Sequence, residues 1–586
     1  MNGKGRKDRK GHMARKTRLL AIVLVAFMAT AIRAADSPVA DAAMRGDAAA
    51  VKALLEKGGD VNAAQGDGMT PLHWAAMHAD AELTGVLLYA GANVRATTRL
   101  GGYTPLHLAA QEGAAGVVDA LAAAGANVNA ATTTGATPLM LAAAAGQMAS
   151  AKALLDRKAE PNLTESANGE TALMFAAAFD RADVVKLLLE RGANAALTSA
   201  TVDLSDKVAP EDALQKEIRD KQNAESAART GNPAPAVPSA SERARQVAGL
   251  TRPYEFNELI GKQGGLTALH FAARQGARQT AEALVGAKAD VNALSPADGT
   301  TPLVIAAING HFDLAKYLLD HGANPNLPSH SGMTALYAAL NVEWAPRMFY
   351  PQPRAHLQQQ TSYLELMKAL LENGADPNAR VRRKIWYTQY NFDLLRVDEA
   401  GATPFWRAAY ASDIAAMKLL VEHGADPNIA TIKPPANARF QQGGTRSGDG
   451  RDGSGMPPIP TGGPDIPPLV AAAGAGYGEG FAANAHRFAP TGMLEAVKYL
   501  VEELHADVNA RDADGNTALH NAAARGDNEM IQYLVSKGAD VKAVNRTGQT
   551  TVDMANGPVQ RTQPFPETIK LLEELGAKNN HKCVSC

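Results

Sequence analysis

The chain has 586 residues, more than one hydrophobic core usually organises, so several domains or an elongated repeat array are expected. Apolar residues make up 46% of the chain and aromatic residues only 5%, which does not fit the core of a large globular enzyme and favours closely stacked helices. Beyond residue 34 the chain has 49 basic and 59 acidic residues, and this net charge of −10 argues against a nucleic-acid partner.

The N-terminus has the layout of a secretory signal. Eight Lys and Arg residues precede the apolar run at 19–32, and Ala34 and Ala35 follow it. An apolar helix of this length spans about 21 Å, which is shorter than a bilayer core of about 30 Å. Residues 1–34 are therefore predicted to be a signal peptide cleaved after Ala34, which predicts a periplasmic or extracellular protein without a stable membrane span. An uncleaved anchor is the alternative.

Next along the chain comes an internal repeat. A Thr-Pro-Leu or Thr-Ala-Leu triplet recurs, with adjacent spacings of 33 or 34 residues, at Thr70, Thr104, Thr137, Thr171, Thr267, Thr301, Thr334 and Thr517. A Gly stands two residues before each triplet, and an Ala-Ala pair, an apolar helical stretch and Gly-Ala-Asn/Asp-x-Asn follow in most copies. These residues resemble the ankyrin repeat.

Each repeated position also has a physical role. The Thr hydroxyl caps a first helix, and Pro fits its first position because it has no N–H to satisfy. The Ala pairs let neighbouring helices approach closely, and Gly ends the second helix in the left-handed conformation. The predicted fold is an all-α repeat solenoid of about 12 repeats, each a helix-turn-helix with a β-hairpin finger, interrupted by inserted loops. Repeats 1 to 12 start near Asp36, Gly68, Gly102, Gly135, Gly169, Gly265, Gly299, Gly332, Gly401, Pro467, Gly515 and Gly548.

Composition divides the chain further. The predicted segments are repeats 1–5 at 35–200, a charged and Pro-rich linker at 201–264, repeats 6–9 with aromatic insertions at 265–430, a disordered Gly/Pro loop at 431–466, repeats 10–12 with a C-terminal cap at 467–580, and a Cys-x-x-Cys tail at 581–586.

Three aromatic insertions interrupt the pattern, at 344–363 in repeat 8, 380–399 between repeats 8 and 9, and 474–490 in repeat 10. Residues 337–410 contain 12 of the 30 aromatic residues of the chain. The first and third replace turns on one edge of the array, so they can meet over repeat 9, whereas the second extends a finger on the concave side. Trp, Tyr and Arg are enriched at binding hot spots. The predicted binding residues are Arg382, Arg383, Trp386, Tyr387, Tyr390, Trp344 and Trp406. The alternative is that the large side chains only fill irregular packing around the insertions.

No catalytic residue is predicted. His73, His107, His270 and His520 share one repeat position, where imidazole can hydrogen-bond neighbouring turns, so they are interpreted as structural. Gly-x-Ser-x-Gly, His-Glu-x-x-His and phosphate-loop motifs do not occur in the sequence. We therefore expect a protein that is not an enzyme and has no metal or cofactor.

The only two cysteines are Cys583 and Cys586. They are expected to form a small disulfide or a thiol pair, to carry haem if a His follows Cys586, or to bind metal together with His581.

The leading hypothesis is an exported, non-enzymatic scaffold that binds protein partners through the concave face, as the ankyrin resemblance implies, and through the aromatic insertions. The alternative is a redox or haem-linked periplasmic protein that uses the cysteine pair.

Overall fold

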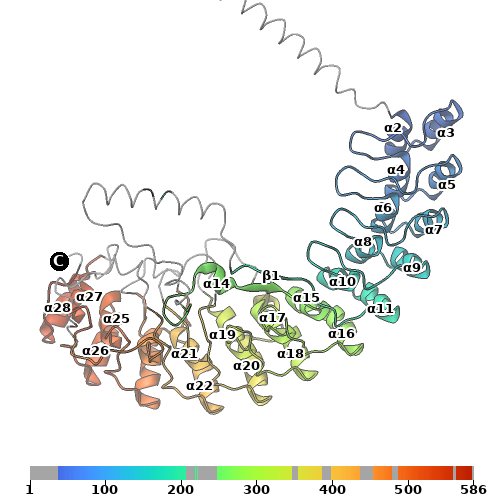
Figure 1. The fold of residues 1–586 in the computed structure, drawn as a ribbon. Coiled ribbons are helices and arrows are strands. Elements are labelled where there is room, and N and C mark those ends of the chain that lie inside the picture. Colours follow the sequence, from blue (N-terminus) through green and yellow to red (C-terminus); the bar gives the residue numbers. More distant parts are fainter. Residues whose placement is uncertain are drawn as a thin grey trace, which may run out of the picture. The chain divides into compact units, whose positions relative to one another are not determined.

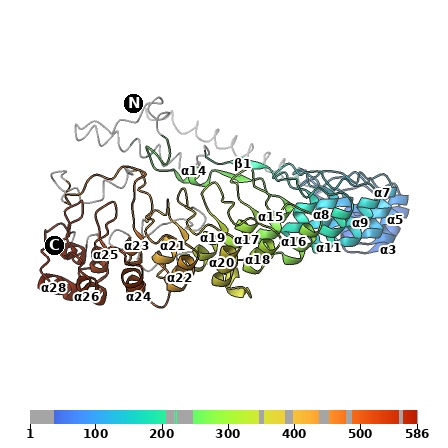
Figure 2. The ribbon, with the colours of Figure 1, turned by 90° about the horizontal axis from the view of Figure 1, so that it is seen from below.

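The computed structural model describes residues 37–205, 218, 221, 247–345, 354–385, 397–435, 452, 454–477, 486–557 and 563–583. The predicted signal peptide at 1–34 lies outside these residues. The chain divides into two compact units, which we call unit 1 (Met1–Asn194) and unit 2 (Ala195–Cys586). Within each unit the helices alternate between two rows, and extended fingers project beside the first row (Figures 1 and 2).

Unit 1 is built of helix pairs in chain order. The helices are α2 (Pro38–Met44), α3 (Ala48–Glu56), α4 (Pro71–Met77), α5 (Ala81–Tyr89), α6 (Pro105–Gln111), α7 (Ala115–Ala123), α8 (Pro138–Ala145), α9 (Met148–Asp156), α10 (Ala172–Ala178) and α11 (Ala182–Glu190). The even-numbered helices form the first row.

Unit 2 continues the same pairing. Its helices are α14 (Phe256–Ile260), α15 (Ala268–Gln275), α16 (Arg278–Gly286), α17 (Pro302–Ile308), α18 (Phe312–Asp320), α19 (Ala335–Glu343), η1 (Ala355–Gln358), α20 (Tyr363–Glu372), α21 (Pro404–Tyr410), α22 (Ile414–Glu422), α23 (Pro468–Ala472), α24 (Met493–Lys498), η4 (Tyr499–Glu503), α25 (Ala518–Arg525), α26 (Asn528–Ser536), α27 (Thr551–Ala555) and α28 (Pro566–Glu574). The predicted all-α repeat solenoid is confirmed.

The first helices begin where the Thr positions predict. The Thr70 side chain accepts a hydrogen bond from the amide of His73, and Thr137 and Thr301 cap α8 and α17 in the same way. Leu72 and the Ala75–Ala76 pair of α4 are fully buried. Because these small side chains meet between neighbouring first helices, the backbones of successive repeats can stack closely.

Fingers connect the repeats through single bridges and turns rather than through the predicted regular hairpins. Thr164 pairs with Thr171 at one isolated bridge, and in the described residues the named strands are β1 (Thr201–Asp203) and β2 (Lys262–Gly264). An asparagine in several fingers also joins adjacent repeats: Asn292 Nδ2 donates to the carbonyl of Gly322 at 3.0 Å, and its Oδ1 accepts from the amide of Asn324 at 2.7 Å. Bonds between neighbouring fingers therefore add to the short pairing within each finger.

The predicted linker at 201–264 is ordered at both ends. Strands β1 and β2 pair antiparallel, with Thr201 opposite Gly264 and Asp203 opposite Lys262, and α14 lies directly before β2. We call residues 201–205 and 247–264 the strap; it lies on the finger side of unit 2 (Figure 1). These ends are ordered because backbone pairing satisfies their polar groups, which composition does not reveal.

The predicted loop at 431–466 is also structured at its ends. The amide of Thr431 donates to the carbonyl of Ile466 at 3.1 Å, and that of Lys433 donates to Gly463 at 2.8 Å. These bonds extend the finger between repeats 9 and 10, so the loop is shorter than predicted. Among the described residues, every helix is too short or too polar to cross a bilayer.

Candidate functional site

The repeated histidines are structural, as predicted. The Nδ1 atom of His107 accepts from the amide of Thr104 at 3.1 Å, so the Nε2 atom carries the proton and donates to the carbonyl of Ala136 in the next repeat at 3.1 Å. The side chain is fully buried, and burial lowers its pKa to about 4. His73 and His270 repeat this arrangement. Both ring nitrogens of these three histidines are hydrogen-bonded, whereas His520 shares only the Nδ1 bond, which it accepts from the amide of Thr517 at 3.2 Å.

Trp344 and Trp406 do not present a binding surface, which corrects their assignment as binding residues. Trp406 is fully buried in α21, and its Nε1 donates to the carbonyl of Ile466 at 2.8 Å. Trp344 is also buried, and its Nε1 donates to Oδ2 of Asp413 at 2.8 Å. The packing alternative therefore holds for both indoles, because each fills the interior and finds an acceptor there.

The insertions of repeats 8 and 10 meet over repeat 9. Asp413, the N-cap of α22, also accepts from the Tyr363 hydroxyl at 2.7 Å. From repeat 10, the Arg487 guanidinium lies 5.9 Å from the Trp344 ring centre, and His486 stacks on Tyr410 at 4.4 Å. The two insertions thus cover this face of α21.

Arg407 lies at the centre of this buried cluster and is 2% exposed. Its Nε donates to Asn341 Oδ1 and its Nη2 to the carbonyl of Trp344, both at 2.7 Å, and Nε lies 3.9 Å from a carboxylate oxygen of the buried Glu399. Arg407 follows Thr403 by four residues, as Trp74 follows Thr70, so the two occupy equivalent positions in their repeats. In repeat 9 that position is sealed from solvent.

Unit 1 leaves the equivalent position open. Side chains four residues after each capping Thr lie half-buried on four successive first helices, and apolar side chains at the C-terminal ends of two of these helices are more exposed. We call this set the apolar face: Trp74, Met77, Leu108, Leu141, Phe175 and Phe179. Phe179 is 54% exposed and Met77 41%. The Nε1 atom of Trp74 donates to Gln65 Oε1 in the preceding finger at 2.8 Å, which places this face beside the fingers.

The apolar face is not among the surfaces predicted from the sequence, although the sequence contains a signal for it. Large apolar residues stand beside the Ala-Ala pairs at one repeat position in α4, α6, α8 and α10. Close stacking already uses the Ala pairs and the Leu of the triplet, so an additional apolar residue on each helix has no core position left to fill.

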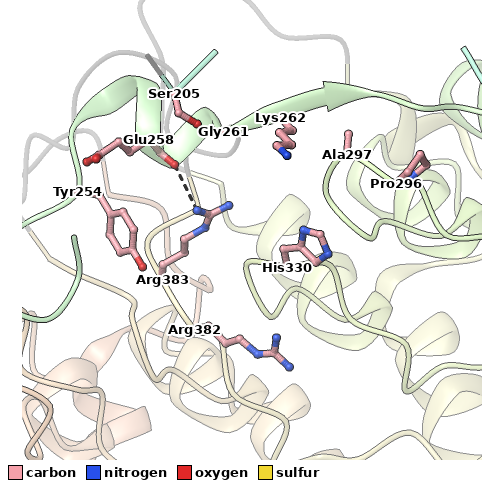
Figure 3. Close-up of a pocket in the computed structure, with 10 residues that line it drawn as sticks. All are labelled: Ser205, Tyr254, Glu258, Gly261, Lys262, Pro296, Ala297, His330, Arg382 and Arg383. Atoms are coloured by element: carbon pink, nitrogen blue, oxygen red, sulfur yellow. Dashed lines mark hydrogen bonds between the residues drawn. The ribbon is translucent and has the colours of Figure 1, made fainter. Parts of the chain in front are cut away.

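Arg382 and Arg383 belong to a pocket of about 460 Å³ in unit 2 (Figure 3). The strap contributes one wall, and three successive fingers contribute the rest. The lining residues are Ser205, Tyr254, Glu258, Gly261, Lys262, Pro296, Ala297, His330, Arg382 and Arg383. We call this cavity the strap pocket.

Contacts across the strap pocket hold the strap on the fingers. The Nη1 atom of Arg383 donates to the carbonyl of Glu258 at 3.2 Å, and its guanidinium lies 5.7 Å from the ring centre of Tyr254. The Glu258 carboxylate faces Arg252 instead, with two bonds of 2.5 and 2.6 Å, and this pairing lowers its pKa. The sequence placed these strap residues in a linker and could not associate them with Arg383.

Trp386, Tyr387, Tyr390 and Cys586 lie outside the described residues, and Cys583 is disulfide-bonded. In the part of the chain that the structure describes, His, Cys, Asp and Glu nowhere gather in a group of three or more that could hold a metal ion.

Comparison with protein families matches the repeats directly. A model described as ankyrin repeats (3 copies) matches residues 39–132, 117–199 and 269–345, one described as ankyrin repeats (many copies) matches 485–535, and one described as ankyrin repeat matches 400–432. Together they cover more than half of the chain. The exact number of repeats stays a prediction.

Curated relatives are similar to short parts of the chain. The mouse (Mus musculus) B-cell lymphoma 3 protein homolog is 39% identical over 75 residues, which are 13% of this chain and 17% of that protein. The rat (Rattus norvegicus) protein phosphatase 1 regulatory subunit 12A is 37% identical over 95 residues, or 16% of this chain and 8% of that protein. Rat ankyrin repeat and SAM domain-containing protein 6 is 38% identical over 88 residues, which are 15% of this chain and 10% of that protein. The chain thus spans less than a fifth of the length of each.

Proposed function

Because the chain belongs to the ankyrin repeat family, we propose that it is a non-enzymatic scaffold that binds protein partners, and that the apolar face of unit 1 is its main binding surface. The supporting observation is the row of half-buried apolar side chains at one position of four successive repeats. Contiguous apolar patches of this kind on soluble proteins mark interaction sites.

The side chains of the apolar face differ in what they would gain on binding a partner. Phe179 and Met77 keep apolar area in water that a partner can cover, whereas Trp74 is already fixed by its bond to Gln65 and pays little entropy on binding. In unit 2 the buried Arg407 and its covering insertions close the equivalent position in repeat 9. Unit 1 is therefore the better surface for a partner helix or extended segment.

Photo-crosslinking tests this surface. A benzoylphenylalanine at position 108, on the apolar face, should crosslink to a second protein in cells that make the chain, while the same group at position 123, exposed on the second helix of the same repeat, should not. Phe179→Ala should weaken capture by about 1 to 2 kcal/mol because it removes exposed contact area. Equal crosslinking at both positions would exclude the apolar face as the binding site.

We also propose that the scaffold is exported by the signal peptide at 1–34 and acts in the periplasm or outside the cell. The N-terminus of the mature protein should then be Ala35, because the charged, apolar and small-residue zones end there. Sequencing of the N-terminus of protein recovered outside the cytoplasm measures this. Recovery of an intact residue 1 or 13 from the membrane fraction would contradict cleavage and support an anchor.

A further inference from the structure

We propose that the strap pocket is a second binding site, which takes the carboxylate side chains of an acidic peptide segment. It is independent of the apolar face, because it lies in unit 2 and is built from a different part of the repeat. The site joins the strap to three successive fingers, so residues far apart in sequence face one open space (Figure 3).

The lining carries an excess of positive charge. Lys262, Arg382 and Arg383 are cationic, and the single acidic side chain, Glu258, is already paired with Arg252 outside the lining. Lys262 lies 3.8 Å from Asp203, and both side chains are about half-exposed, so water screens that pair strongly. The lining residues therefore carry more positive than negative charge, in a chain whose overall charge is negative.

Several donors in the strap pocket have no partner among the described residues. Neither a hydrogen bond nor an ion pair joins the Arg382 guanidinium or the His330 ring to another described side chain or backbone group. The Nε atom of Arg383 is buried and is likewise unpartnered in that part of the chain. Arg382 and His330 are exposed, so an incoming carboxylate can reach them and replace their water with charge-assisted hydrogen bonds beside Arg383.

The fingers fix the position of these donors. The amide of His330 donates to the carbonyl of Asp298 at 2.6 Å, and the amide of Arg382 donates to Ser331 at 2.8 Å. Arg383 is held from above by the carbonyl of Glu258. The donors are thus attached to a backbone that is already ordered, which reduces the entropy lost when a ligand binds.

The pocket favours carboxylates on a peptide over a nucleic acid. Its volume of about 460 Å³ suits a few side chains, and Tyr254, Pro296 and Ala297 provide apolar walls for their methylene groups. The net charge of −10 beyond residue 34 would repel a long polyanion outside the pocket. A short acidic segment of a protein avoids most of that repulsion.

Fluorescence anisotropy on the full chain tests the proposal. The probe is a short fluorescein-labelled peptide of alternating Glu and Gly, and the matched control peptide has Gln in place of Glu. We expect the Glu peptide to bind, the Gln peptide to bind at least about tenfold more weakly, and added salt to weaken the Glu peptide. No measurable binding of the Glu peptide would overturn the proposal.

Matched variants locate the binding. Arg382→Glu should weaken the Glu peptide at least about tenfold, since it replaces an unpartnered cation with a like charge. Lys542→Glu makes the same change in net charge at an exposed site of unit 2 outside the pocket and should leave binding unchanged. Equal losses in both variants would show attraction by the overall field and contradict a built site.

Two further measurements distinguish the acidic-peptide site from a phosphate site and from the apolar face. The first measures binding of tripolyphosphate and of a short RNA. If either binds more tightly than the Glu peptide and is weakened equally by Arg382→Glu, the pocket is a phosphate site and the peptide assignment is overturned. Phe179→Ala should leave Glu-peptide binding intact, because that residue lies in unit 1. Loss of crosslinking at the apolar face with retained peptide binding would refute only the proposed function.

Discussion

Replacement of Arg407 by Met should destabilise unit 2 by about 3 to 5 kcal/mol, because it removes one partner of a buried charged network. The guanidinium is 2% exposed and donates to Asn341 and to the carbonyl of Trp344. Without it, these acceptors lose their donors and the buried Glu399 loses the positive charge beside it. Hydrogen exchange of peptides from α19 to α22 measures the loss, with unit 1 peptides as the internal reference.

Two further variants test whether the loss of stability comes from the buried charge. Lys316→Met removes one side of an exposed pair with Asp320 and should change stability by less than about 1 kcal/mol. The double variant Arg407→Met with Glu399→Met should be less destabilised than Arg407→Met alone, because it removes the buried negative charge as well. A double variant no more stable than the single one would mean that lost packing, rather than the charge left behind, explains the effect.

Acid should destabilise unit 1 by at least about 3 kcal/mol between pH 7 and pH 4 through its buried histidines. Burial lowers the pKa of His107 to about 4 and also lowers that of His73. In the unfolded chain these groups take up protons near pH 6.5, whereas the folded chain does not, so the unfolded state binds more protons below that pH. Stability is therefore fully present above about pH 6.5 and falls toward pH 4.

The chain itself supplies the substitution that isolates this effect. Met140 and Met174 occupy the position of His107 in repeats 4 and 5, behind the same Thr cap. The variant His73→Met with His107→Met should be less stable than the native chain at pH 7, because it loses two bonds between repeats, and the difference should shrink by about 3 kcal/mol by pH 4. Hydrogen exchange of α6 to α10, corrected for the intrinsic pH dependence, measures it.

The exposed His78 provides the matched control in the same unit. His78→Met should leave the pH dependence of unit 1 unchanged. Between pH 7 and pH 4, unit 1 of the native chain should lose more stability than unit 1 of the double Met variant. Equal losses would show that the buried histidines do not determine acid sensitivity.

The repeated part of the fold could be predicted from the sequence because its causes are local. Thr caps, Ala pairs and Gly terminators act within one repeat or between adjacent repeats, so their spacing gives helix starts, helix ends and stacking. The structural role of His107 follows for the same reason, since its partners are Thr104 and the next turn of backbone.

Only the tertiary structure decided which irregular residues face solvent. Trp344 is predicted from the sequence to be a binding residue, yet it is buried where the insertions of two repeats meet, and Arg407 is buried beside it. Arg383 gains its partners from a strap about 125 residues earlier in the chain. Composition and periodicity report local preference, whereas burial depends on which distant segment covers a side chain, and that is set by long-range packing.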